Sequence, residues 1–358
     1  MDVAVLDKAV FPRDKVCAGW ITPPIIDSLE LDLDEYVSAG KPRSCDASAS
    51  LQPARVFQPF TSFVTGLIGG PEVCTEYARP VSYGIRRCEF DAYLLQRSGA
   101  RLMLGQPLQE LRAEADGWTI NGRLRAPLVI GAGGHFCPVA RMLAEIDPQL
   151  DDPVVLAQEV EFPLPEAVAD AFPVRHERPE LFFCPDLAGY GWIVRKGNYL
   201  NIGIGREHER NLSTHLEQFL EFLRQRGKLT IDIPQPFRGH AYKLRRHVPP
   251  VHVPDRVLLI GDAAGLAYPQ SGEGIRPAIE SGLIAAETIL EAHGHYAGSL
   301  WRRYRERCDR RFGRGSGRTR WLPAPLKTWA AGRLMQTGWF NRHVLLDRWF
   351  LHAHQPAL

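Results

Sequence analysis

The sequence predicts an α/β fold with a second, β-rich domain and a helical C-terminal tail, on three observations. An apolar run at 257–260 leads directly into Gly261-Asp262 and then into a helical stretch at 273–292. A second apolar run, 3–6, also ends in an acid, Asp7. Short strand-like runs fill the middle of the chain. Strands that alternate with helices indicate a layered α/β architecture.

The individual elements follow from composition and spacing along the chain. Apolar runs bounded by turn-forming residues predict strands at 3–6, 101–104, 118–120, 124–130, 154–162, 200–205 and 257–260. Helical spacing or helix-forming composition predicts helices at 90–97, 212–226, 273–292 and 297–312. Prolines, or a high content of Ser, Ala and Pro, predict loops at 8–24 and 38–54.

The bulk composition is that of a soluble globular enzyme. The 358 residues are 45% hydrophobic and 23% charged. No apolar run approaches the roughly 18 residues of a membrane span, and no signal peptide is visible, so we expect a cytoplasmic protein. Seven cysteines without CxxC pairs indicate reduced thiols. We predict no metal site, because the histidines and cysteines lack metal-ligand spacing.

The C-terminal tail differs from the rest of the chain in charge and in tryptophan content. Residues 301–358 carry 13 Lys/Arg, three Asp/Glu and five of the eight tryptophans, so the remaining 300 residues have a net charge of −8. Two interpretations stay open. The tail is a helical cap whose arginines pair with the acidic body, or it contacts an anionic membrane peripherally. No nucleic-acid motif accompanies these charges, so we expect no nucleic-acid partner.

The segment 257–287 has the composition of a cofactor-binding strand, turn and helix. Gly261 lets the backbone approach a ligand closely, and Asp262 offers a carboxylate to hydroxyl groups. After Pro269, the residues Gly272-Glu273-Gly274-Ile275 begin a helix whose first N–H groups would face an electron-rich group. The alternative is an ordinary crossover in which the glycines merely permit the turns.

This segment resembles the second FAD motif of the geranylgeranyl-reductase-like flavoproteins, within the para-hydroxybenzoate-hydroxylase-like group. The resemblance implies a Rossmann-like FAD-binding domain. It assigns Asp262 to the ribityl chain of FAD and the amides of Gly274 and Ile275 to the pyrimidine edge of the flavin. Gly261, Pro269 and Gly272 complete this set of candidate cofactor-binding residues.

Three further stretches resemble the same family. Residues 3–19 are similar to its second strand and following loop, which implies that Asp7 binds the adenosine ribose and that Arg13 lies near the cofactor. Residues 87–91 resemble its Arg-x-x-Phe-Asp helix start, so Arg87 would lie near the cofactor phosphates. Residues 130–134 resemble the strand that returns under the cofactor.

The candidate substrate residues come from another resemblance. Tyr190-Gly191-Trp192 followed by Gly203-Ile204-Gly205 resembles the geranylgeranyl reductases' Tyr-x-Trp and Gly-x-Gly stretches, which line a lipid pocket. Tyr190, Trp192, Gly203 and Gly205 are therefore candidate substrate-binding residues. An aromatic pair of core strands is the alternative. Cys17 is the candidate catalytic residue, as an acid or redox partner in a loop near the flavin, and an inert packed cysteine is its alternative.

The family's N-terminal strand–Gly-x-Gly-x-x-Gly–helix has no counterpart in this sequence, where residues 1–30 contain only Gly19. Two explanations stay open. Met1 lies inside a longer protein, or the chain is a degenerate member that binds FAD weakly. Without the central strand of that unit, we expect a sheet edge to be exposed.

The sequence thus predicts an FAD-dependent oxidoreductase that reduces carbon–carbon double bonds in an apolar, lipid-like substrate, with NAD(P)H as electron donor. The FAD-binding domain would comprise 1–37, 80–150 and 245–295, the substrate domain 38–79 and 151–244, and the tail 296–358. A flavin monooxygenase or halogenase is the first alternative, although 189–195 only half resembles the halogenase Trp-x-Trp-x-Ile-Pro stretch. A non-catalytic remnant that binds a lipid or a partner is the second.

Overall fold

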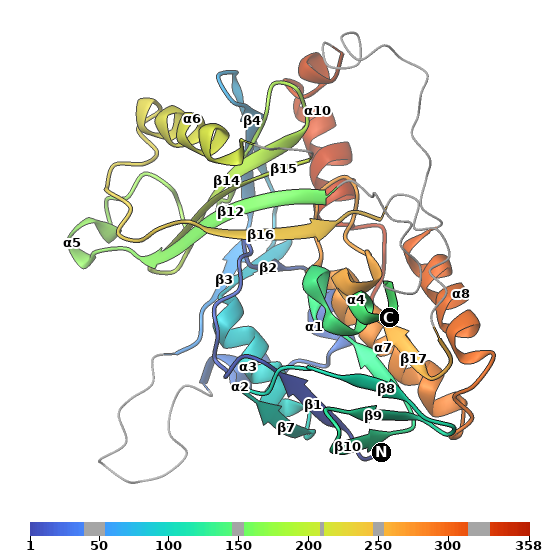
Figure 1. Ribbon diagram of the computed structural model, residues 1–358. Helices are drawn as coiled ribbons and strands as arrows, with labels where there is room; N and C mark the ends of the chain where they lie inside the picture. The colour runs from blue at the N-terminus through green and yellow to red at the C-terminus, as the bar shows by residue number, and fades with distance from the viewer. Residues whose placement is uncertain (39–53, 145–153, 208–210, 246–253, 314–329) are drawn as a thin grey trace. The chain divides into compact units, whose positions relative to one another are not determined.

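A computed structural model describes residues 1–38, 54–144, 154–207, 211–245, 254–313 and 330–358 (Figure 1). The chain divides into two compact units, which we describe separately. Unit 1 comprises Met1–Val10, Ala100–Val155 and Ala241–Arg320, and unit 2 comprises Phe11–Gly99, Leu156–His240 and Trp321–Leu358. Residues 11–37 and 80–99, which we predicted in the FAD-binding domain, belong to unit 2. The tail is shared between the units.

The strands of unit 1 form two parallel pairs and an antiparallel meander. The bounds are β1 (Ala4–Asp7) with β7 (Arg101–Leu104), β11 (Val129–Gly131) with β17 (Val257–Leu259), and β8 (Leu111–Ala113), β9 (Trp118–Ile120) and β10 (Leu124–Ala126) in the meander. The prediction of one strand at 124–130 was wrong. Pro127 has no N–H to donate to a neighbouring strand. Before it, β10 pairs with β9, and after it, β11 pairs with β17, so the two strands belong to different sheets.

Val3, Leu102 and Ile130 lie in or beside these parallel pairs and expose 48%, 37% and 42% of their surface. Apolar strand residues are usually covered by a neighbouring element. The two pairs therefore present uncovered apolar side chains in unit 1.

The helices of unit 1 follow its strands. They are η1 (Gly134–Phe136), α4 (Pro138–Ala144), η2 (Gly261–Ala264), α7 (Ile275–Glu291) and α8 (Leu300–Phe312). The predicted helices at 273–292 and 297–312 are α7 and α8. Leu300, Tyr304 and Cys308 recur every four residues along α8 and bury one stripe of that helix in the α7 core. The Tyr304 hydroxyl also donates to the Leu259 carbonyl of β17 at 2.9 Å.

Unit 2 contains a seven-stranded mixed sheet in the order β16-β12-β15-β14-β13-β4-β5. Its strands are β4 (Ser62–Leu67), β5 (Glu72–Glu76), β12 (Val154–Pro163), β13 (Glu180–Phe183), β14 (Gly189–Lys196), β15 (Tyr199–Glu207) and β16 (Arg238–Lys243). A smaller sheet contains β2 (Trp20–Ile21), β6 (Ser82–Ile85) and β3 (Phe57–Phe60). The four strands between 57 and 85 were not predicted, because glycines and additional polar residues interrupt the alternation of apolar and polar residues that marks a strand.

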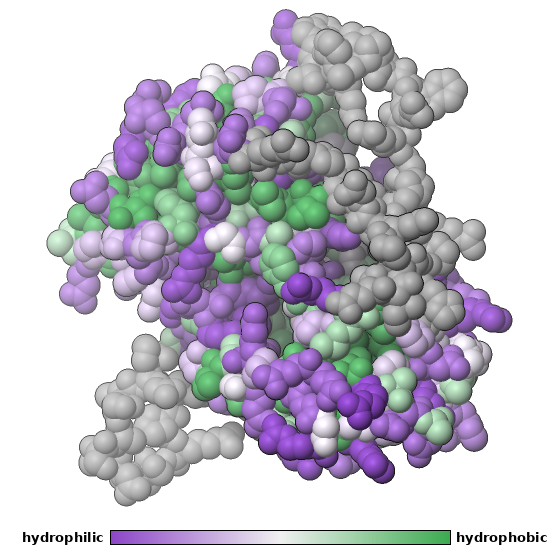
Figure 2. All heavy atoms as spheres, viewed as in Figure 1, coloured by the Kyte–Doolittle hydropathy of each residue, from purple (hydrophilic) through white to green (hydrophobic). Residues whose placement is uncertain are grey.

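Helix α6 (Leu212–Gln225) covers one face of the large sheet (Figure 1). Alternate residues of β12, β14 and β15, such as Val160, Ile193 and Ile202, point to this face and form the main core with Phe219 and its neighbours. On the side shown in Figure 2, hydrophobic residues form a band over this sheet. The intervening residues of the same strands point to the opposite face.

The other helices of unit 2 are α1 (Pro23–Ser28), α2 (Leu33–Ser38), α3 (Arg87–Arg97), α5 (Glu166–Ala169), α10 (Gly338–Phe340) and the π-helix η3 (Asn341–Phe350). η3 packs on aromatic residues of the unit: the Phe350 ring lies 5.3 Å from Tyr190 and 6.2 Å from Trp20. The buried Asn341 side chain accepts a bond from Thr65 Oγ1 at 2.6 Å and donates to two carbonyls. The C-terminal segment is therefore an integral part of unit 2.

Candidate functional site

In unit 1, the predicted cofactor segment forms a tight turn between β17 and α7. Gly261 has a φ of 57°, and a Cβ at this position would lie 3.0 Å from the Ala278 Cβ of α7. A larger residue would therefore be strained and would push α7 away. The Asp262 Oδ1 would lie 3.0 Å from a Cβ on Gly274, so this carboxylate lies beside the start of α7.

The start of α7 carries its own carboxyl group. Gly274 is the N-cap residue, and Glu273 Oε1 accepts the Arg276 N–H at 2.7 Å. Burial raises the pKa of Glu273 to about 7, against a lowering effect of the Arg276 and Ile275 amides. The Arg276 and Ile275 amides of the first turn are thus already engaged by Glu273. Pro269 lies in the loop before the helix, and Gly272 packs against the Tyr242 hydroxyl.

Asp7 ends β1 as the sequence analysis predicted, and its Oδ1 accepts the Ala9 N–H at 2.8 Å. His135, which we did not single out, lies in η1 and is electrostatically coupled to Asp262. Burial and the charge of Lys243 lower the pKa of His135, while Asp262 acts in the opposite direction. Asp7 and Asp262 each stand at the carboxyl end of a parallel strand, where α/β proteins bind ligands.

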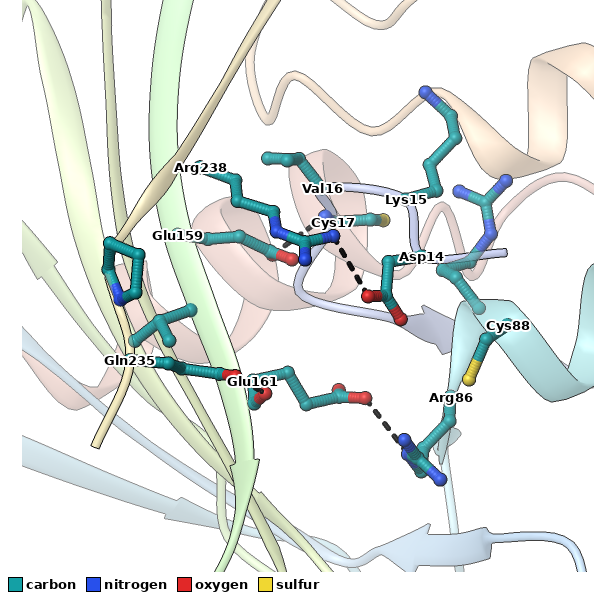
Figure 3. Close-up of a pocket in the computed structure, with 13 residues that line it drawn as sticks. Asp14, Lys15, Val16, Cys17, Arg86, Cys88, Glu159, Glu161, Gln235 and Arg238 are labelled. Carbon is teal, nitrogen blue, oxygen red and sulfur yellow. Dashed lines mark hydrogen bonds and ion pairs between the residues drawn. The ribbon is translucent and has the colours of Figure 1, made fainter. Parts of the chain in front are cut away.

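In unit 2, a cavity of about 80 Å³ opens between the loop before β2, the start of α3, and β12 (Figure 3). It is lined by Asp14, Lys15, Val16, Cys17, Arg86, Arg87, Cys88, Glu159, Val160, Glu161, Gln235, Pro236 and Arg238. Ligand pockets usually measure about 300–1,000 Å³, so this cavity holds part of a ligand at most. No group of three or more candidate metal ligands occurs in the described part of the chain.

Two of the predicted residues line this cavity and a third lies beside one of them. Cys17 and Arg87 are lining residues, and the guanidinium of Arg87 forms paired bonds with Asp91 at 2.8 and 2.9 Å. Arg13 also reaches Asp91, at 3.7 Å, and its guanidinium lies 4.6 Å from the Phe11 ring centroid. Asp91 and Cys17 raise the pKa of Arg87 despite its burial. Arg87 therefore stays charged at the cavity.

A buried polar network beside Cys17 was not predicted from the sequence. Lys196 is fully buried in β14, pairs with Glu161, and donates to the carbonyls of Ala18 and Ile85 at 3.0 and 2.9 Å. Arg86 Nε donates to Glu161 at 3.0 Å. The only signal in the sequence is the alternation of polar and apolar residues along 159–162. That pattern equally fits a strand with a solvated face.

The four predicted substrate residues come together on the face of the large sheet opposite α6. Tyr190 pairs with Gly205 and Trp192 with Gly203 in the β14–β15 ladder. A Cβ on Gly203 would lie 2.3 Å from the Trp192 ring, so glycine is what lets the indole lie over β15. The Trp192 N–H donates to Asn201 Oδ1 at 2.7 Å, which links this aromatic surface to the polar network.

No family model matches the chain, but individual proteins do. The chain is 28% identical over 298 residues to the chloroplastic geranylgeranyl diphosphate reductase of Oryza sativa, and the alignment covers 77% of this chain and 58% of that protein. It is 26% identical over 306 residues to digeranylgeranylglycerophospholipid reductase 3 of Methanosphaera stadtmanae, covering 80% and 70%. The chain is thus similar in sequence to geranylgeranyl and digeranylgeranylglycerophospholipid reductases. The resemblance predicted from the sequence is thereby confirmed. The chain spans 58–70% of the length of these two relatives.

Solved structures agree on the fold of the chain. A geranylgeranyl bacteriochlorophyll reductase-like protein of Thermoplasma acidophilum superposes with a TM-score of 0.68 at 20% identity, covering 93% of this chain and 81% of that one. The halogenase PltM L111Y mutant, solved in complex with FAD, superposes with a TM-score of 0.60 at 16% identity. The superposition covers 86% of this chain and 68% of the halogenase. These structures confirm the predicted α/β fold, and the sequence relatives, which are named as reductases, support the oxidoreductase class.

Proposed function

We propose that the protein is an FAD-dependent reductase of carbon–carbon double bonds in an apolar, isoprenoid-like substrate. The observation that carries the proposal is the homology, over about three quarters of the chain, to reductases named for geranylgeranyl substrates. The monooxygenase and halogenase alternatives rest on structural similarity at or below 18% identity, which supports the fold alone.

The described residues of unit 1 fit FAD. Asp7 and Asp262 place carboxylates at the ends of parallel strands, where they would accept bonds from ribose and ribityl hydroxyls. Gly272 and Gly274 keep side chains away from the start of α7, so backbone amides near Ile275 would face the flavin once Glu273 releases them. Arg87, which we predicted near the cofactor phosphates, is charged and pairs with Asp91 in unit 2.

Bound FAD would supply hydride transfer, and this chain would supply binding and orientation. The sequence holds no second dinucleotide motif, so we propose that NAD(P)H reduces the flavin from a transient position. Tyr190 and Trp192, held over Gly203 and Gly205, would contact the apolar chain of the substrate.

An anaerobic half-reaction tests the proposal. The protein is loaded with FAD, reduced with NADPH or with dithionite, and mixed with geranylgeranyl diphosphate or a geranylgeranylated glycerolipid. We expect flavin reoxidation and a product heavier by two hydrogens for each double bond reduced. Reoxidation that occurs only with oxygen, together with hydroxylated product, would instead identify a monooxygenase. A protein that binds isoprenoid lipid but never FAD would be the non-catalytic remnant.

We also propose a peripheral contact between the C-terminal tail and an anionic membrane. In α8, Arg307 pairs with Glu291 and Arg311 with Glu280, as the cap interpretation expects. Further along the tail, Trp339 and Leu334 are 67% and 47% exposed, so this segment is the better membrane candidate. None of the helices in the described part of the chain is long and apolar enough to cross a membrane.

A further inference from the structure

Two glutamates project from the same face of β12 toward the cavity of unit 2 (Figure 3). Glu159 and Glu161 are two residues apart, so a strand places both on one side of the sheet. Glu159 is 6% exposed, and the Glu161 side chain is 17% exposed. When two neighbouring carboxyl groups are buried, the charge on one makes ionisation of the other less favourable. The remaining hydrogen-bond and ion-pair partners of Glu159 and Glu161 therefore decide which of the two holds a proton.

Glu161 has cationic partners. The fully buried Lys196 ammonium and the Arg86 guanidinium both bond to this carboxylate. Burial opposes ionisation of Glu161, but these two cations outweigh it and hold its pKa below the usual range. Glu161 is therefore the charged member of the pair.

Glu159 has only neutral hydrogen-bond donors. The Cys17 N–H donates to Glu159 Oε2 at 2.6 Å, and Asn201 Nδ2 donates to the same oxygen at 3.3 Å. No ion pair reaches Glu159 from any residue that the structure describes. Both donors use Oε2, so Oε1 is the oxygen left to carry a proton. A buried carboxyl group without a cation partner favours its neutral form.

Given the proposed reductase function, we propose that Glu159 is the proton donor for the double bond. Bound FAD would supply the hydride, with its electron pair, to one alkene carbon. The other carbon forms its new C–H bond with the proton of Glu159 as the O–H bond breaks, which leaves a carboxylate. That carboxylate regains a proton from water in the cavity. The Cys17 amide, already bonded to Oε2, stabilises the carboxylate that forms.

The electrostatic surroundings agree with this role. Burial, with the neighbouring Glu161 charge, raises the pKa of Glu159 to about 8, and Lys196 opposes the shift. A general acid is most effective when its pKa lies near the working pH. The charged and titratable groups around the cavity, besides Glu161 and Lys196, are Asp14, Lys15, Cys17, Arg86, Arg87, Cys88 and Arg238, with His240 bonded to Lys15.

The first test needs neither cofactor nor turnover. Besides Glu273, which titrates near pH 7, infrared or ¹³C NMR spectra of protein labelled at glutamate should show a second carboxyl group that stays protonated at pH 7 and titrates near pH 8. This signal should vanish in Glu159→Gln and persist in the matched control Glu221→Gln, which alters an exposed glutamate on α6. If no glutamate other than Glu273 is protonated at pH 7, the proposal is wrong whatever the enzyme does.

The second test follows single turnovers of the FAD-loaded protein. Glu159→Gln should bind FAD and accept electrons normally, yet reoxidise with the alkene about 10²–10⁴-fold more slowly. The wild-type rate should fall as pH rises past 8, and that decline should be absent in the variant. If Cys17→Ser removes the step while Glu159→Gln retains it, Cys17 is the donor. A wild type that shows the titrating carboxyl but no alkene-dependent step would contradict the reductase function instead.

Discussion

Asp262 lies in the turn between β17 and α7, beside Gly274, which has no side chain to cover the start of the helix. Because a carboxylate there would bond to a cofactor hydroxyl, Asp262→Ala should weaken FAD binding by about 1.5–3 kcal/mol. That loss corresponds to roughly a tenfold to hundredfold rise in Kd, measurable by flavin fluorescence titration. Asp116→Ala, in an exposed turn of the same unit, is the control. An unchanged Kd in Asp262→Ala would remove this residue from the site.

The charge of Lys196 stabilises the folded protein, whereas Asp262 is proposed to bind the cofactor. Its ammonium is fully buried and bonds to Glu161 and to two backbone carbonyls. Lys196→Met should lower the free energy of unfolding by about 3–5 kcal/mol, because Glu161 loses its closest cation. Urea denaturation measures this loss. Arg175→Ala removes an ion pair whose arginine side chain is 63% exposed and should change stability by about 1 kcal/mol or less.

Glu273 gives unit 1 a pH dependence whose sign is fixed. Its pKa is about 7 in the folded protein, above the ordinary value of about 4.3 for glutamate. The folded state therefore holds a proton that the unfolded state releases, so the contribution of Glu273 to stability is fully present below about pH 4.3 and is lost as pH rises through 7. Glu273→Gln should flatten this slope in thermal melts. Glu287→Gln, on the exposed side of α7, should retain it.

Helices, strands and turns could be predicted from the sequence where the residues that form a pattern are close together along the chain. The strand, turn and helix around Gly261 are contiguous, so spacing alone placed Asp262 beside the start of α7. Tyr190 and Trp192 alternate with core residues on one strand, and their common face followed from that period. Glu159 and Lys196 lie on strands separated by β15. Only the folded sheet shows that both are buried on the same face.

The C-terminal π-helix η3 supplies a testable element. Phe350 is 1% exposed and contacts Trp20, Phe183 and Tyr190. Phe350→Ala should destabilise unit 2 by about 3–5 kcal/mol, because it leaves a cavity against the sheet. Chemical denaturation monitored by tryptophan fluorescence would show the loss. Trp339→Ala, which truncates an exposed ring of the same segment, should leave the midpoint unchanged. Equal effects would mean that η3 is not anchored through Phe350.

At the scale of the whole molecule, charge is distributed unevenly along the chain. Residues 301–358 carry about +10, against −8 for the rest. Part of that positive charge is used inside unit 1, where Arg311 and Arg276 share the buried Glu280. Only the arginines without such partners are available to attract a surface of opposite sign.

Vesicle sedimentation tests the membrane contact. We expect binding to anionic vesicles that weakens with salt, and little binding to neutral ones, because basic side chains contribute about 1 kcal/mol each near an anionic surface. The double variant Trp339→Ser with Leu334→Ser should bind less, whereas Phe136→Ser, an exposed aromatic of unit 1, should bind as the wild type does. Protein that stays in the supernatant at low salt would leave the tail as a cap alone.

The burial of Lys196 has a consequence for proteolysis. Arg195 and Lys196 are adjacent trypsin sites, yet they are 8% and 0% exposed in a strand held between β13 and β15. A protease can reach them only after β14 has left the sheet. Cleavage there follows the population of opened molecules, whereas a cut after the exposed Arg333 does not. The ratio of the two fragments therefore reports how often the centre of this sheet comes apart under native conditions.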